Sequence, residues 1–84
     1  MSFEESCESA KRFEWSNEEK QLLYGLYKQA TVGDITEDRP TGMLSWVAQA
    51  KWDAWNAKRG LPSEQAKAEY IQVVNQKRIK SGEE

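Results

Sequence analysis

Apolar residues along the chain recur every three or four positions, and the alternation typical of strands is missing. Such a period gathers apolar side chains on one face of a helix, so the pattern predicts an all-α protein. We expect four helices, over residues 3–14, 17–32 and 46–59 and from residue 62 onward.

The starts of two helices carry recognisable signals. Ser16 is followed three residues later by Glu19, which is the spacing of a capping box. Pro62 is tolerated at the start of a helix because its missing N–H would have no partner there. Leu61 and Ser63 are the two alternatives for the N-cap of this last helix.

A stretch without helical period, residues 33–45, separates the second and third helices. It begins with Gly33, and its glycine, aspartate and proline residues are typical of turns. About 13 residues at roughly 3.3 Å each can span about 40 Å, whereas a helix advances only about 1.5 Å per residue. The third helix can therefore run parallel to the second.

Length and composition exclude several classes of protein. The 84 residues are expected to form one domain, residues 1–84. Histidine is absent and Cys7 is the only cysteine, so zinc fingers, histidine-dependent triads and intrachain disulfides are excluded and no metal site is expected. A net charge of -2 argues against a nucleic-acid partner. The sequence carries no apolar run of membrane-spanning length and no signal peptide, so we expect a cytoplasmic protein without stable membrane insertion.

Two sets of residues are candidates for ligand binding. Tyr24, Tyr27 and Lys28 lie at spacings of three and four, so they share one side of the second helix. Together they could grip an aromatic ring that bears a phosphate. Alternatively, the tyrosines are half-buried core residues and Lys28 is solvated. Lys51 beside Trp52 has the same two interpretations, an ion site or the edge of the core.

Longer strings of sequence bear on these alternatives. Residues 27–35 read Y-K-Q-A-T-V-G-D-I and residues 50–56 read A-K-W-D-A-W-N. Over about residues 24–71 the chain closely resembles the acyl-CoA-binding protein family. The resemblance implies a four-helix bundle in an up-down-down-up arrangement, in agreement with the long connection at residues 33–45.

The resemblance also implies ligand contacts at positions where this sequence keeps the family's residue type. Tyr24, Lys28 and Lys51 would hold the ribose 3′-phosphate of coenzyme A. Tyr27 would stack on adenine, and Tyr70 would contact the nucleotide from the last helix.

Other positions add to this pattern or depart from it. Lys11, on the first helix, falls at a further coenzyme A contact of the family. Lys20 and Gln21 stand where relatives usually have apolar residues that line the acyl groove. Val47 and Gln49 stand where family members often have lysines.

The function implied by the resemblance is the binding of medium- to long-chain fatty acyl-CoA esters with high affinity. The protein would be a monomeric intracellular carrier and pool former without cofactor, with acyl-CoA-using enzymes as transient partners. A helical module that docks proteins through residues 33–45 is the alternative. Catalysis is not expected, because without histidine only serine, Cys7 or a carboxylate could act as nucleophile.

Overall fold

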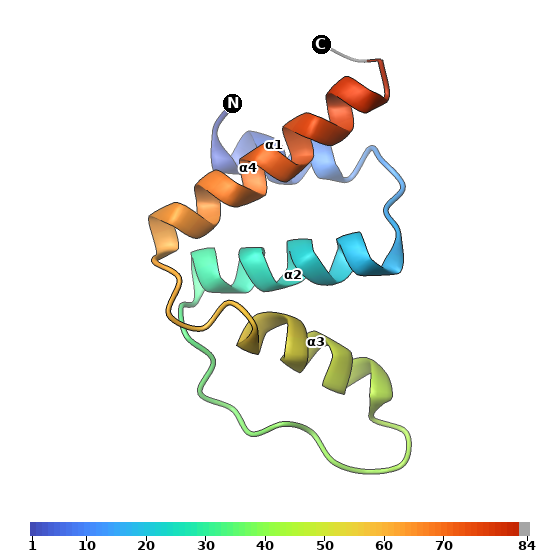
Figure 1. Ribbon diagram of the computed structural model, residues 1–84, viewed down its shortest axis with the longest axis vertical. Helices are drawn as coiled ribbons and strands as arrows, with labels where there is room; N and C mark the ends of the chain where they lie inside the picture. The colour runs from blue at the N-terminus through green and yellow to red at the C-terminus, as the bar shows by residue number, and fades with distance from the viewer. Residues whose placement is uncertain (83–84) are drawn as a thin grey trace.

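The computed structural model describes residues 1–82 and contains four helices in that range. They are α1 (Phe3–Ala10), α2 (Asn17–Thr31), α3 (Trp46–Asn56) and α4 (Ser63–Lys80). α1 and α4 run in one direction and α2 and α3 in the other, which confirms the all-α, up-down-down-up bundle expected from the sequence (Figure 1).

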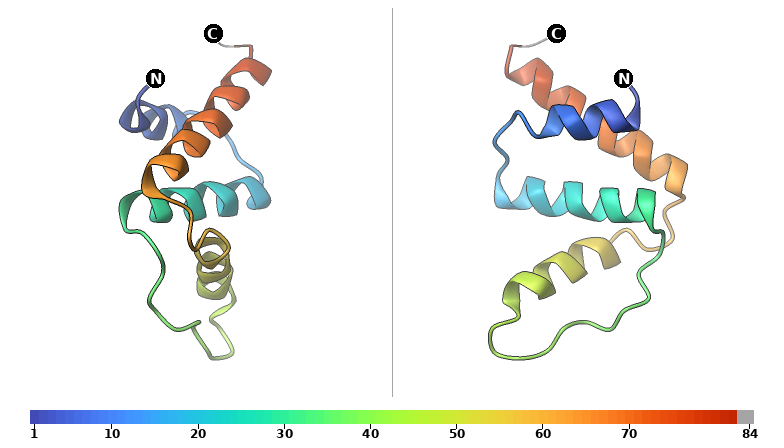
Figure 2. Two further views of the ribbon diagram at one scale, coloured as in Figure 1. Left: turned by 60° about the vertical axis from the view of Figure 1, so that its left-hand side comes forward. Right: turned by 180° about the vertical axis from the view of Figure 1, so that it is seen from behind.

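α2 is the central helix of the bundle. It packs against α3 on one side and α4 on the other, while α1 lies across α4 (Figure 2). The core forms around Leu23, Leu26, Tyr70 and Val74, where α1, α2 and α4 meet. The burial of apolar area contributes roughly 25 cal/mol per Å², and it is the main term that holds the helices together. α1 and α2 share α4 as their neighbour and are held apart, which leaves room between them.

Both of the first two helices start with a capping box. At α2 the Glu19 amide donates to the Ser16 hydroxyl (3.1 Å) and the Ser16 amide to the Glu19 carboxylate (2.8 Å), as the sequence predicts. Ser2 and Glu5 form the same pair of bonds at α1. This second box has the same S-x-x-E spacing and was equally visible in the sequence.

The periodicity predicts that the first helix ends at residue 14, but α1 ends at Ala10. The next amides bond to carbonyls three residues back instead of four, so the chain continues in tighter turns. The last of these bonds joins the Phe13 amide to the Ala10 carbonyl over 3.3 Å. The same carbonyl accepts the Trp15 indole N–H at 2.9 Å, and the rings of Phe13 and Trp15 pack edge to face at 6.2 Å. A side chain thus takes the carbonyl that a longer helix would use.

α3 likewise ends at Asn56, before the expected boundary at residue 59. The amides of Lys58 and Arg59 bond to carbonyls three residues back, at 3.0 and 3.1 Å, and so wind the chain into tight turns. Gly60 has a φ of 87°, a conformation that favours glycine, and it ends this segment. The cap of α4 is Pro62, so neither of the two positions expected from the sequence is correct.

Residues 33–45 lie along α3 in the opposite direction and are held there by side chains of the helix. The start of the loop bonds to residues near the end of α3, and the end of the loop bonds to residues nearer the start of α3. The bonds are Trp55 Nε1 to the Gly33 carbonyl (2.8 Å), Trp52 Nε1 to the Glu37 carbonyl (2.7 Å), Arg39 to Asp53 (2.9 and 3.0 Å) and Gln49 Nε2 to the Pro40 carbonyl (2.8 Å). The loop therefore returns the chain to the start of α2, which makes α2 and α3 parallel.

Candidate functional site

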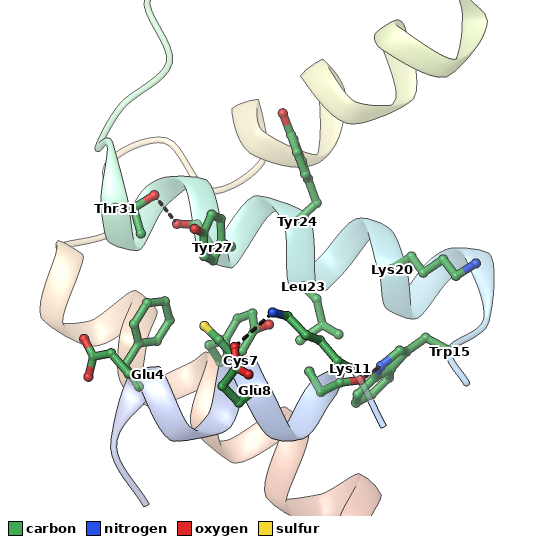
Figure 3. Close-up of a pocket in the computed structure, with 13 residues that line it drawn as sticks. Glu4, Cys7, Glu8, Lys11, Trp15, Lys20, Leu23, Tyr24, Tyr27 and Thr31 are labelled. Atoms are coloured by element: carbon green, nitrogen blue, oxygen red, sulfur yellow. Dashed lines mark hydrogen bonds and ion pairs between the residues drawn. The ribbon is translucent and has the colours of Figure 1, made fainter. Parts of the chain in front are cut away.

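A cavity of about 750 Å³ opens in the space between α1 and α2 (Figure 3). α4 contributes its floor through Tyr70. We call it the α1–α2 cavity. Four of the residues predicted to bind a ligand line it: Lys11, Tyr24, Tyr27 and Tyr70. Lys11 is the cap at the end of α1 rather than a residue within the first helix, while the tyrosines come from α2 and α4.

Aromatic rings form one wall of the α1–α2 cavity. Phe3 and Tyr27 stack with their centroids 6.1 Å apart and their planes 25° apart. Tyr70 meets Phe3 edge to face at 5.2 Å and lies 6.4 Å from Tyr27. Tyr27 is 44% exposed while Tyr70 is 7% exposed, so Tyr27 is the ring that remains accessible to a flat ligand.

Burial keeps the polar groups at the floor of the cavity neutral. It raises the pKa of the Tyr70 phenol, and the nearby Cys7 thiol adds to the shift. Burial also raises the pKa of Cys7. A protonated thiol is a weak nucleophile, so Cys7 acts here as a small apolar wall residue. Within residues 1–82, no cluster of three metal-ligating side chains is present.

Lys11 supplies a positive charge at the α1 side of the cavity. Its ammonium forms a 2.9 Å ion pair with Glu8 one turn earlier, and Figure 3 shows both side chains beside Cys7. The hydrogen bond to Glu8 raises the pKa of Lys11 by stabilising the protonated form. Both partners are largely exposed, and such a pair is weak and can be exchanged for a ligand anion.

A second cavity, of about 470 Å³, lies between α2 and α3, and we call it the α2–α3 cavity. Lys20 and Tyr24 line both cavities, so the two adjoin at these residues. Figure 3 shows the Tyr24 ring directed toward α3. There the Lys51 ammonium lies 5.8 Å from the centre of the ring. The remaining lining residues are Asn17, Gln21, Trp46, Val47 and Ala50.

Lys28 lines neither cavity. Its half-buried side chain places the ammonium 4.8 Å from the centre of the Trp55 ring, at the contact between α2 and α3. Neither Lys28 nor Lys51 forms a salt bridge with a carboxylate of residues 1–82. The structure thus brings five of the six predicted residues to the two cavities and leaves Lys28 beside them.

Two aromatic residues outside the predicted set also line the α1–α2 cavity, Phe3 and Trp15. Phe3 shares a helical stripe with Cys7, which was the available signal in the sequence. Trp15 lies between the helices and has no such signal. It is held by its bond to Ala10 and by the Lys77 ammonium, which lies 4.9 Å from its ring centre. Trp52 and Trp55, by contrast, hold the loop and line neither cavity.

Comparison with known proteins gives a consistent result. The family model described as Acyl CoA binding protein matches residues 1–74. An acyl-CoA-binding protein of Brassica napus is 50% identical over 76 residues, which cover 88% of this chain and 82% of the relative.

Solved structures of similar proteins share the arrangement of helices. The crystal structure of Oryza sativa acyl-CoA-binding protein 2 matches with a TM-score of 0.89 and 49% identity, over 95% of this chain and 90% of that one. The crystal structure of an ACBP from Moniliophthora perniciosa matches with a TM-score of 0.77 and 31% identity, over 84% and 72% of the two chains.

Proposed function

This chain belongs to the acyl-CoA-binding protein family, and we propose on that basis that it binds medium- to long-chain fatty acyl-CoA esters as an intracellular carrier. The observation that carries the proposal is the pair of adjoining cavities that share Lys20 and Tyr24. One is rich in aromatic rings, and the other combines the apolar side chains of Trp46, Val47 and Ala50 with the polar side chains of Asn17, Lys20, Gln21 and Lys51. A ligand with a nucleotide at one end and an alkyl chain at the other matches this division.

The α1–α2 cavity is proposed to hold the nucleotide. Tyr27 offers an exposed ring for adenine, and stacking of a base on an aromatic side chain contributes about 1–3 kcal/mol. Tyr70 is a neutral phenol at the floor and can donate a hydrogen bond. Lys11 can exchange Glu8 for a phosphate oxygen.

The ribose 3′-phosphate is proposed to lie close to Tyr24. Lys51 is next to the Tyr24 ring, and Lys28 is on the next turn of α2. Both ammonium groups lack a carboxylate partner among residues 1–82 and can form charge-assisted hydrogen bonds with a dianion. Lys28 must first swing away from Trp55, which costs only an interaction of about 0.5–2 kcal/mol.

The α2–α3 cavity is proposed to receive the acyl chain against Trp46, Val47 and Ala50. Each buried methylene contributes about 0.8 kcal/mol, so a dozen could contribute roughly 8–10 kcal/mol before ordering costs. High affinity therefore requires both ends of the ligand. We propose that the protein acts as a cytoplasmic monomer, leaves the thioester intact and passes the ligand to acyl-CoA-using enzymes.

Titration calorimetry with the Lys51→Ala variant tests the assignment of the phosphate. We expect affinity for a long-chain acyl-CoA to fall by at least about 1.5 kcal/mol, or roughly tenfold, because a hydrogen bond to a charged group is lost. The dephospho ester, which lacks the 3′-phosphate, should bind both proteins equally and more weakly than the full ligand. Lys80→Ala, at the far end of α4, is the matched control and should bind as the parent does. Equal affinity of the parent protein for the two esters would contradict the assignment.

A further inference from the structure

A single turn at the end of residues 33–45 presents large apolar side chains to solvent. The Ser45 hydroxyl and amide donate to the Gly42 carbonyl over 2.8 and 3.4 Å and close the turn. Its two central residues, Met43 and Leu44, are 97% and 90% exposed. Central turn positions normally hold glycine, proline, asparagine, aspartate or serine, so these side chains are unusual there.

The exposed surface continues into the first turn of α3. Trp46 is 69% exposed and Val47 is 49% exposed, and with Met43 and Leu44 they form what we call the apolar tip. The tip lies within residues 40–50, which is the longest uncharged run of a chain that is 31% charged. In Figure 1 the loop that carries it forms the end of the molecule away from both termini.

The apolar tip is continuous with the α2–α3 cavity, because Trp46 and Val47 belong to both. Two lysines, Lys20 and Lys51, also line this cavity, and none of its described lining residues is a carboxylate. An apolar projection with two cations behind it is complementary to a lipid surface that carries negative head groups.

We infer that the apolar tip docks the protein onto an anionic lipid surface, where the acyl chain of the ligand passes between the bilayer and the α2–α3 cavity. The inference rests on the proposed function, since it assigns that cavity to the acyl chain. An acyl chain that leaves a bilayer at the tip can stay in contact with apolar groups along its route. Transfer through open water would expose every methylene.

The shape of the tip favours lipid over a protein partner. A stable protein interface buries about 800 Å² on each side over a broad face, whereas the tip is one turn and the beginning of a helix. Tryptophan is well suited to the interface between water and lipid tails, and residues 40–50 carry no charged side chain that would have to be desolvated there. No helix of residues 1–82 is long and apolar enough to cross a bilayer, so the docking is peripheral.

Vesicle co-sedimentation of the ligand-free protein tests this inference. We expect binding to phosphatidylcholine vesicles that contain phosphatidylserine, weaker binding to pure phosphatidylcholine, and a further loss at high salt. The double variant Met43→Glu with Leu44→Glu should bind the anionic vesicles at least about tenfold more weakly, because it removes both inserted side chains and adds like charge. Val32→Glu with Ile79→Glu is the matched control. These residues are 61% and 63% exposed and lie outside the tip, so binding should stay close to that of the parent.

Several outcomes would overturn the inference. One is an absence of binding to either kind of vesicle, and another is an equal loss in the tip variant and the control variant. A third contradicting outcome would come from sedimentation equilibrium. If the parent protein self-associates and the tip variant does not, the apolar tip is an interface between copies of the chain. Calorimetry without vesicles separates this inference from the proposed function: the tip variant should bind acyl-CoA as the parent does. If neither protein binds acyl-CoA, the proposed function fails while the vesicle result still decides whether the tip docks on lipid.

Discussion

Lys20 shows how one residue affects both parts of the site. It lines both cavities, and Gln21 beside it lines the α2–α3 cavity, so two polar side chains border the space proposed for the acyl chain. An ammonium or amide in contact with methylenes must give up part of its hydration, which reduces the gain from burying the chain. The flexible stem of Lys20 can offset this by directing the ammonium to water.

The double change Lys20→Met with Gln21→Leu measures this effect. We expect stronger binding of the longest acyl chains by about 1 kcal/mol, the scale of one or two buried methylenes, with shorter chains nearly unchanged. Titration calorimetry over a series of chain lengths provides the measurement. Lys80→Met with Gln76→Leu makes the same changes at exposed positions of α4 and should have no effect. Equal affinities of parent and double variant across the series would show that these positions do not set chain-length preference.

At the scale of elements, the contact between α2 and α3 depends on a residue without a side chain. Gly25 is buried in the middle of α2, directly against the backbone carbonyl of Ala54 in α3. A Cβ at this position would collide with that carbonyl, and a backbone atom cannot move aside as a side chain can. The two helices therefore approach closely at this point. Within α3 itself, Trp55 is the one buried residue, so this backbone contact with α2 matters for holding the helix in place.

The variant Gly25→Ala should accordingly destabilise the protein. In a free helix the change would be favourable by about 0.5–1 kcal/mol, but here we expect a net loss of about 1–3 kcal/mol because α3 must shift outward. Urea unfolding gives the free energy of unfolding directly. Gln72→Ala, an exposed position inside α4, is the control and should change stability by less than about 0.5 kcal/mol. A Gly25→Ala protein as stable as its parent would show that α3 moves without cost.

At the scale of the whole molecule, one carboxylate joins three separate segments. Asp34 Oδ1, at the start of the loop, accepts the Gly60 amide at 2.7 Å and the Gln29 side-chain amide at 2.6 Å. Gln29 also donates to the Leu61 carbonyl at 3.0 Å. The end of α2, the loop and the connection from α3 to α4 are thereby fixed together. These hydrogen bonds, with the Gly60 amide first, lower the pKa of Asp34.

The lowered pKa predicts a specific pH dependence of stability. Folding favours the ionised form of Asp34, so its contribution is present above the ordinary carboxyl value of about 3.9 and is lost as the pH falls below it. Asp34→Asn keeps an acceptor oxygen without the charge. We expect the parent to be more stable than this variant near neutral pH, and the difference in urea unfolding to shrink progressively as the pH falls below the ordinary carboxyl value toward the lowered pKa of Asp34. Asp38→Asn, in the same loop, should show no such difference, and a gap for Asp34→Asn that persists in acid would contradict the assignment to its charge.

Local sequence determined the elements of this protein and the chemistry available to it. Apolar spacing gave the four helices, Ser16 and Glu19 gave the start of α2, and the length of residues 33–45 allowed the parallel pair. Such signals act between residues a few positions apart, so they are readable without the fold. The tyrosines and lysines that line the cavities were also identifiable, because their spacing on α2 and the family strings were visible in the chain.

Only the tertiary structure decided where these groups face and what lies between them. The end of α1 depends on the Trp15 indole that takes the Ala10 carbonyl, and the position of Lys28 depends on Trp55 of another helix. The division of the site into two cavities arises because α4 holds α1 away from α2. The exposure of Met43 depends on how the loop is fixed along α3. Each of these features results from contacts between residues distant in sequence, whose geometry is set by packing and not by local periodicity.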